Sequence, residues 1–292
     1  MAEENLITTA DLDLAKAREI EFAYRFNESL NTLLAALGTT RKIGKRSGTL
    51  LKAYKATGVL QDGNVPEGDI IPLSKYTVEP VSFEEITIQK WRKATSIEAI
   101  SEHGYDQAAE MTLDAMLKDV QKGVRTKFFA ALAKGTGRAS GNTIQRALAN
   151  TWGQLQVAYE DIDFEAVYFM NPLDVADYLG TAQITTQTAF GMTYAENFLG
   201  LGTVFFTKGV PQGTIYGTAE ENLVLYFLDV RDEDIARRFK FTTDMTGLIG
   251  VHESANYDNL TAPDVVISGV TLWAERVDGV VVTTIENDAT GA

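Results

Sequence analysis

Two long stretches of the chain repeat apolar residues at the three- and four-residue spacing of an α-helix. The spacing predicts a first helix over residues 9–37, with Asp11 and Asp13 in the first turn, where the helix dipole favours anions, and Gly38 as its stop. Its apolar positions are Ile20, Tyr24, Leu30, Leu33, Leu34 and Leu37. A second long helix is predicted over residues 105–134, and its apolar face comprises Ala108, Met111, Ala115, Leu117, Val124, Phe128 and Leu132.

Between the two helices, residues 48–90 have the pattern of a long hairpin. Turn-forming residues are concentrated in 62–68, and apolar residues alternate with polar ones in the returning strand at Val81, Phe83, Ile86 and Ile88. Pro72 and Pro80 argue against a central strand of a packed sheet, because proline cannot donate a ladder hydrogen bond. A two-stranded arm is marginally stable alone in water, so it needs a surface to lie on. The sequence shows no obvious cover for this hairpin or for the first helix.

The second half of the chain changes to mixed helices and strands. Glycines in residues 136–142 predict a loop that serves as a hinge and a domain boundary. Helices are predicted over 151–162 and 171–180, the latter with Asn171 as N-cap and Pro172 at its first position. Strands are predicted over 166–171, 203–207, 213–218, 222–228, 237–243 and 264–285, the last with a tight turn at Asp278–Gly279, before a frayed tail.

Composition and charge narrow the class of protein. The net charge is -14 and the pI is near 4.6, which opposes tight DNA binding over the whole chain and fits either ordinary solubility or a container lining that does not trap DNA. Cysteine is absent, which excludes disulfides, thiolate metal sites and cysteine nucleophiles. The acidic N-terminus is not a signal peptide, and no apolar run reaches the roughly 20 residues that span a bilayer.

One short stretch runs against the acidic balance. Residues 41–55 contain only basic charges, at Arg41, Lys42, Lys45, Arg46, Lys52 and Lys55. A solvated strand or loop face explains any single one of them. As a group they also fit a contact with an acidic neighbouring subunit, or weak contact with DNA.

The chain offers little catalytic chemistry. His103 and His252 are its only histidines, and neither Ser101 nor Ser254 lies in a nucleophile elbow. The glycines near 135–141 fail the dinucleotide-binding spacing, and the acidic residues at 229–234 lack calcium-loop spacing, so a solvated turn explains them. We therefore expect no enzyme, no cofactor and no metal site.

The order of the segments resembles that of a known family. The residues that carry the likeness are VPEGDIIPLS at 65–74, KWRKATSIEAI at 90–100, YFMNPLDVADYL at 168–179, LGTVFFTKGVPQGTIYGT at 201–218 and WAERVDGVVVTTI at 273–285. In this order they resemble the major capsid protein of tailed bacteriophages, whose fold is shared by encapsulin compartments and the herpesvirus capsid floor.

The resemblance implies an α+β fold with four regions. They are an N-terminal arm with a helix at 1–46, an extended E-loop hairpin at 47–82, a P-domain with a long spine helix at 83–145 and 231–276, and an α/β A-domain at 146–230 and 277–286. Some relatives carry a large N-terminal scaffolding segment. Only about forty residues precede the hairpin, so we expect that segment to be absent, either never encoded or already removed, and Met1 favours the first alternative.

The resemblance also implies a function and partners. The chain would assemble with itself into hexamers and pentamers of an icosahedral shell, a virion capsid built in the host bacterial cytoplasm around double-stranded DNA that it does not read by sequence. Further partners would be a separate scaffolding protein, a portal and head-completion proteins, and no membrane. The candidate subunit-contact residues are Arg41, Lys42, Lys45, Arg46, Lys52, Lys55, Asp62, Gly63, Asn64, Pro66 and Glu67.

Two other interpretations remain at this point. An encapsulin-like compartment around a cargo enzyme shares the fold and the length, although the long hairpin favours the phage. An unrelated α/β enzyme that uses carboxylates would need a pocket with convergent polar groups, and it would leave the hairpin and the first helix unexplained.

Overall fold

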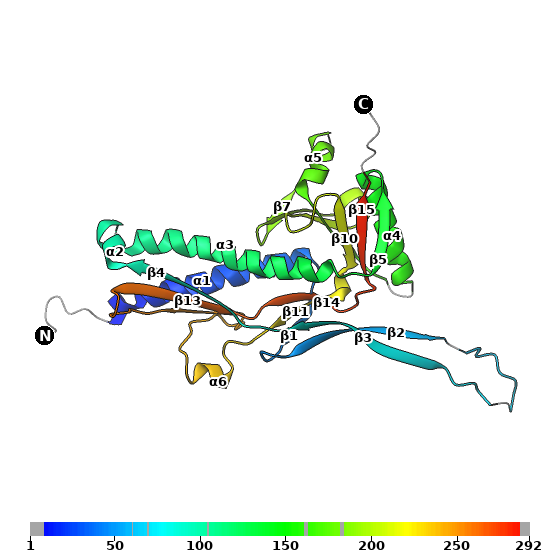
Figure 1. The fold of residues 1–292 in the computed structure, drawn as a ribbon, viewed down its shortest axis with the longest axis horizontal. Helices are drawn as coiled ribbons and strands as arrows, with labels where there is room; N and C mark the ends of the chain where they lie inside the picture. Colours follow the sequence, from blue (N-terminus) through cyan, green and yellow to red (C-terminus); the bar gives the residue numbers. More distant parts are fainter. Residues whose placement is uncertain are drawn as a thin grey trace.

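The computed structural model describes residues 9–59, 61–68, 70–103, 105–160, 163–181 and 184–286. Figure 1 shows an elongated body in which long helices lie along strands, with a lobe standing on one side of it and a two-stranded arm projecting from one end. The element order follows the predicted change from long helices and hairpin to a mixed second half.

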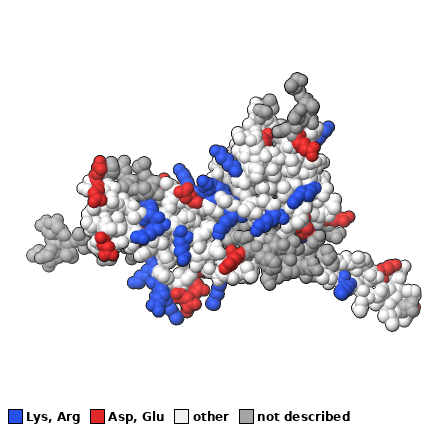
Figure 2. Space-filling model, in the orientation of Figure 1, with Lys and Arg blue, Asp and Glu red and all other residues white. Residues whose placement is uncertain are grey.

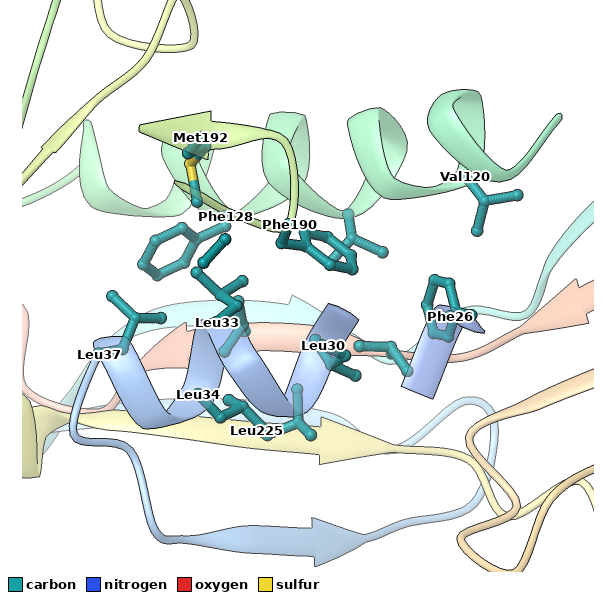
Figure 3. Packing of buried hydrophobic residues seen from close by; sticks show 14 of the residues in the cluster. Phe26, Leu30, Leu33, Leu34, Leu37, Val120, Phe128, Phe190, Met192 and Leu225 are labelled. Atoms are coloured by element: carbon teal, nitrogen blue, oxygen red, sulfur yellow. The ribbon is translucent and has the colours of Figure 1, made fainter. Parts of the chain in front are cut away.

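Helix α1 (Thr9–Ala36) is covered by the chain itself, contrary to what the sequence alone indicated. It lies between α3 (Tyr105–Leu132) and the strands of the body, and Figure 3 shows its side chains pointing into this interior. The buried residues of α1 and the turn after it are Phe22, Ala23, Phe26, Leu30, Leu33, Leu34 and Leu37. The prediction was wrong for Ile20 and Tyr24, which are exposed, because α1 carries two apolar stripes and the stripe through Phe22 and Phe26 faces the core.

Helix α3 provides the opposite wall of the same core. Its buried apolar residues are Met116, Leu117, Val120, Val124, Phe128, Phe129 and Leu132. This confirms most of the predicted face, but Ala115 is exposed, and the side chains of Ala108 and Met111 lie outside the described part of the chain. Phe128 and Phe129 pack against Phe169 with ring centroids 5.3 and 5.4 Å apart, which joins the helix to the lobe.

A three-stranded antiparallel sheet forms the floor of the body. Strand β13 (Thr261–Ser268) lies between β12 (Ile249–Glu253) and β4 (Gln89–Ser96), and the short α2 (Ile97–His103) leads from β4 toward α3. The buried carboxylate of Glu19 holds α1 to this floor, since it accepts hydrogen bonds from the Glu253 amide and the Thr242 hydroxyl. Both oxygens of the Glu19 side chain thus accept hydrogen bonds, as polar groups buried in a protein interior generally do.

The lobe is built on a seven-stranded mixed sheet. Its strands are, in spatial order, β5 (Gly137–Gly141), β15 (Val280–Ile285), β10 (Thr214–Ala219), β6 (Ala166–Met170), β9 (Thr203–Phe206), β8 (Met192–Ala195) and β7 (Gln187–Ala189). The predicted glycine loop at 136–142 is therefore wrong for most of its length. Gly137–Gly141 forms an edge strand that pairs in parallel with β15, and the lack of side chains lets Gly137 approach Val280 and Val281 closely.

Two longer helices and two single 3-10 turns complete the lobe. Helix α4 (Ile144–Ala158) begins seven residues before the predicted 151, because the Thr143 hydroxyl caps it by accepting from the Arg146 amide at 3.2 Å. Helix α5 (Pro172–Thr181) begins as predicted, with the Asn171 side chain accepting from the Leu173 amide. The 3-10 turns are η1 (Phe198–Gly200) and η2 (Glu220–Asn222).

A second three-stranded sheet connects the arm to the body. Strand β11 (Leu223–Phe227) pairs in parallel with β1 (Lys42–Gly44) and antiparallel with β14 (Thr271–Ala274). The strand predicted at 237–243 is wrong. That stretch follows the short α6 (Glu233–Ala236), and only Thr242 bridges to a strand residue, Val251. The two alternating aromatic residues of this stretch, Phe239 and Phe241, stack their rings on each other, and the stretch forms no strand.

Candidate functional site

The most unusual feature of the molecule is an arm made of two strands that pair with each other alone within the described residues. We call it the hairpin arm: β2 (Leu50–Val59), β3 (Lys75–Glu85) and the residues between them. Figure 1 shows it extending away from the body and the lobe. Pro80, which argued against a central strand of a packed sheet, pairs with Tyr54 next to a register shift in this two-stranded ladder.

The base of the arm is anchored in the fold. Leu51 and Ile86 are buried in a small cluster with Val224, Tyr226 and Trp273. The backbone amide of Gly48 donates to Ile86, and the amide of Ile86 donates to Thr49, at 2.9 and 3.0 Å. The arm therefore leaves the body in a fixed direction set by its base.

The far end of the arm, which we call the arm tip (residues 61–68 and 70–74), makes only local hydrogen bonds among the described residues. The Asn64 amide donates to Asp62 Oδ1 at 2.9 Å, and the Gln61 amide donates to Ser74 Oγ at 3.0 Å. Five predicted contact residues lie here, all of them exposed: Asp62, Gly63, Asn64, Pro66 and Glu67. The turn chemistry thus shapes the tip without attaching it to the body.

The arm tip also exposes apolar residues that the sequence reasoning did not single out. Ile70 and Leu73 are each 94% exposed, and Ile71 is also open to solvent, as is Val59 at the end of β2. Large apolar side chains gathered on one projecting element are typical of an interaction surface. The sequence feature that could have predicted them is the IIPL segment at 70–73, which directly follows the run of turn residues and belongs to no helix or strand with a buried face.

The basic residues at the start of the arm are not equivalent. Arg41 makes two hydrogen bonds to the Glu275 carboxylate, at 2.7 and 3.1 Å, and Lys42 Nζ donates to Asn31 Oδ1 at 2.7 Å. Lys45 and Arg46 are exposed and make no side-chain hydrogen bond or ion pair among the described residues. Arg41 and Lys42 therefore bind partners within their own subunit, whereas the side chains of Lys45 and Arg46 have no partner among the described residues.

The remaining two basic candidates are on the arm itself. Lys52 and Lys55 belong to β2, where they pair with Phe83 and Glu79 of β3. Their side chains lie outside the described part of the chain. The six basic candidates consequently extend from the body along the near half of the arm, and the five turn candidates lie at its far end.

The histidines and acidic turn have structural roles where they are described. His252 of β12 packs its ring edge-on against Phe241, with ring centroids 6.4 Å apart. The side chain of His103 lies outside the described part of the chain. Asp229 binds Arg231 at 2.9 Å, which lowers the pKa of that carboxyl, and Asp232 caps α6. Among the described residues no group of three or more His, Asp or Glu side chains gathers as a metal-ligand set, and no described helix is both long and apolar enough to cross a membrane.

A half-buried carboxyl of the lobe contacts the turn at the end of α1. Glu220 in η2 lies against Gly38, where an added Cβ would overlap the carboxylate, and Gly38 itself has a φ of 64° that disfavours other residues. Burial, together with the nearby carboxylates of Glu165 and Glu221, raises the pKa of Glu220 to about 7. The group is therefore partly protonated at neutral pH.

This carboxyl makes a testable contribution to the pH dependence of stability. Because its folded pKa lies above the ordinary 4.5, its contribution is complete below about 4.5 and is lost as the pH rises through 7. We expect Glu220→Gln, which keeps the shape and cannot ionise, to raise Tm at pH 8 and to change it little at pH 5. The exposed Glu21→Gln on α1, which is not among the carboxylates that raise the pKa of Glu220, is the control. An equal shift of Tm at both pH values would contradict the assignment.

Comparison with known proteins gives structural likeness without sequence relatives. No family model and no curated protein matches the chain. A virus-like particle from Pyrococcus furiosus has a TM-score of 0.53 at 14% identity, covering 90% of this chain and 97% of its own. The capsid of cyanophage P-SCSP1u has a TM-score of 0.52 at 10% identity, covering 86% and 87%.

An encapsulin complex from Synechococcus elongatus is similar to the same extent. Its TM-score is 0.51 at 11% identity, and the match covers 86% of each chain. Together these likenesses show that the chain has the capsid fold that the resemblance implied, with mixed helices and sheets. At such low identity they show the fold alone.

Proposed function

We propose that this chain, which has the capsid fold, is the major capsid protein of a tailed bacteriophage. In this proposal it is a structural, non-enzymatic subunit that assembles with itself into hexamers and pentamers of an icosahedral shell around double-stranded DNA. The hairpin arm carries the proposal. A two-stranded arm with an apolar, acidic tip has no cover within the described subunit, and a neighbouring subunit would supply it.

The proposal assigns the four regions and the contact residues accordingly. The arm is the E-loop, the body with α3 as the spine helix is the P-domain, and the lobe is the A-domain. The tip residues Asp62–Glu67 and the free charges of Lys45 and Arg46 would contact adjacent subunits, while Arg41 would hold its own subunit together through Glu275. A scaffolding protein, a portal and head-completion proteins would be the other partners.

The encapsulin-like compartment is the alternative that shares the fold. The structural likenesses include both a phage capsid and an encapsulin at nearly equal scores, so the fold does not distinguish them. The feature that favours the phage is the length of the arm. The contents of the particle separate the two functions: DNA in one case and a cargo protein in the other.

Assembly is tested with the purified full chain. We expect sedimentation at micromolar concentration and near-physiological salt to give rings or shells, and electron microscopy to show hexamers, pentamers or closed particles. Particles isolated from infected cells should contain DNA that resists nuclease. A compact monomer as the sole species, even with the phage's scaffolding protein added, would refute the shell function, and particles filled with an enzyme would support the alternative.

A further inference from the structure

A cavity of about 690 Å³ lies where α3 meets α5 and the β7, β8 and β9 end of the lobe. Three cations line it, Lys122 and Arg125 from α3 and Lys208 from the loop after β9, and no carboxylate lines it. Its remaining wall includes the apolar side chains of Phe129 and Phe206. Figure 2 shows basic side chains gathered across the middle of the molecule, along the course of α3. In a chain with a net charge of -14, this is a local concentration of the opposite sign.

The three cations are not compensated within the described part of the chain. No described carboxylate forms an ion pair with any of them. Arg125 is half-buried and donates to the backbone oxygen of Phe190, and burial lowers its pKa. Taking a cation out of water without a counter-charge costs free energy, so an anion in the cavity would recover part of that cost.

The shape of the cavity limits which anion can enter. A DNA duplex carries its phosphates on a convex rod, which can lie across a rim but cannot fill a pocket of this size. The mixture of cations and aromatic side chains instead fits a short peptide segment with carboxylates beside apolar side chains. The occupant should therefore be an acidic and apolar loop.

The arm tip has this composition. Asp62 and Glu67 are exposed carboxylates that no described cation neutralises, and Ile70 and Leu73 are almost fully exposed beside them. The strands of the arm extend about 33 Å, at 3.3 Å per residue over the ten residues of β2, away from the body that holds the cavity. A tip held at that distance reaches the cavity of another copy and not its own.

We propose that the arm tip of one subunit docks in the Lys122–Arg125–Lys208 cavity of a second copy. This inference rests on the proposed shell function and names the receptor for its arm. Carboxylates of the tip meet the three cations, and the apolar tip residues pack against the partly exposed Leu179 in the cavity wall. The opposite local charges orient the arm tip in the cavity and fix its position there, although the negative net charges of the two subunits repel each other.

Crosslinking tests the contact directly, since the chain has no cysteine of its own. Glu67→Cys and Lys208→Cys are introduced together, and assembled particles are treated with a short bismaleimide. We expect chains linked into dimers and higher multimers on a denaturing gel, and no linkage in either single variant. Glu67→Cys with Val157→Cys, an exposed position on α4, is the control pair. Normal shells without linkage of the first pair would overturn the docking and leave the shell function intact.

Charge exchange gives an independent readout. Glu67→Lys and Lys208→Glu should each reduce the particle yield about tenfold, and the double variant should recover most of it, because the pair regains opposite charges. If Lys208→Glu lowers the DNA content of particles while leaving assembly and the charge-exchange yield unchanged, the cavity serves nucleic acid and the docking proposal is wrong. If the unaltered chain forms no assemblies at all, the proposed function itself fails.

Discussion

A variant in which Asp62–Glu67 is removed and the gap is closed with glycines is expected to fold normally and to lose mature shells. The described hydrogen bonds of the arm tip are all local, and none reaches the body. Shortening a surface loop costs little closure entropy, with each doubling of length worth only about 0.6 kcal/mol. The deletion should therefore leave the fold of the subunit core unchanged. It should prevent the formation of mature shells, because the shortened arm would no longer reach its neighbour.

Circular dichroism and particle imaging of the same preparations measure both effects. A variant that replaces 62–67 by Gly and Ser residues at unchanged length is the control that separates reach from chemistry. If it assembles and the deletion does not, reach is what the tip provides. An unfolded deletion variant would mean that the arm belongs to the core, and normal mature shells would mean that the tip joins no subunits.

Replacing Phe26 by alanine should destabilise the subunit strongly. Phe26 is 0% exposed and packs edge-on against Phe190 of the turn between β7 and β8, with ring centroids 5.8 Å apart, in the interior between α1 and α3 (Figure 3). Removing a fully buried aromatic ring leaves a cavity and costs about 3–5 kcal/mol. That is a large fraction of the about 5–15 kcal/mol by which a domain is stable.

Urea denaturation of the unassembled protein, followed by circular dichroism, measures the loss. Ile20→Ala is the matched control on the same helix, because Ile20 is exposed and its replacement should change the free energy of unfolding by about 0.5 kcal/mol or less. Equal effects of the two variants would mean that α1 does not use the Phe22 and Phe26 stripe to join the core.

Elements with a strong local signal could be predicted from the sequence. The Asn171–Pro172 pair fixed the start of α5, since proline lacks an amide proton and the asparagine side chain caps the next one. The length and charge pattern of α3, and the run of turn residues between β2 and β3, were equally local. The predicted domain boundaries and contact residues remain predictions.

Features that depend on distant partners could not be predicted in this way. Helix α1 has two apolar stripes, and only the position of α3 and the floor decides that Phe22 and Phe26 turn inward. Gly137–Gly141 becomes a strand because β15, far along the chain, offers an edge to pair with. The cavity joins Lys122 of α3 to Lys208 of the lobe, and no spacing in the sequence relates them.

The anchoring of α1 affects the order in which the chain can fold during synthesis. Glu19 is held by Glu253 and Arg41 by Glu275, and each pair is separated by 234 positions. Helix α1 therefore leaves the ribosome long before these partners are translated, with its apolar stripe covered at most by α3 in the meantime. Such distant pairings slow folding and leave the nascent chain prone to aggregation. A chaperone that protects this stripe would then influence how much folded protein accumulates.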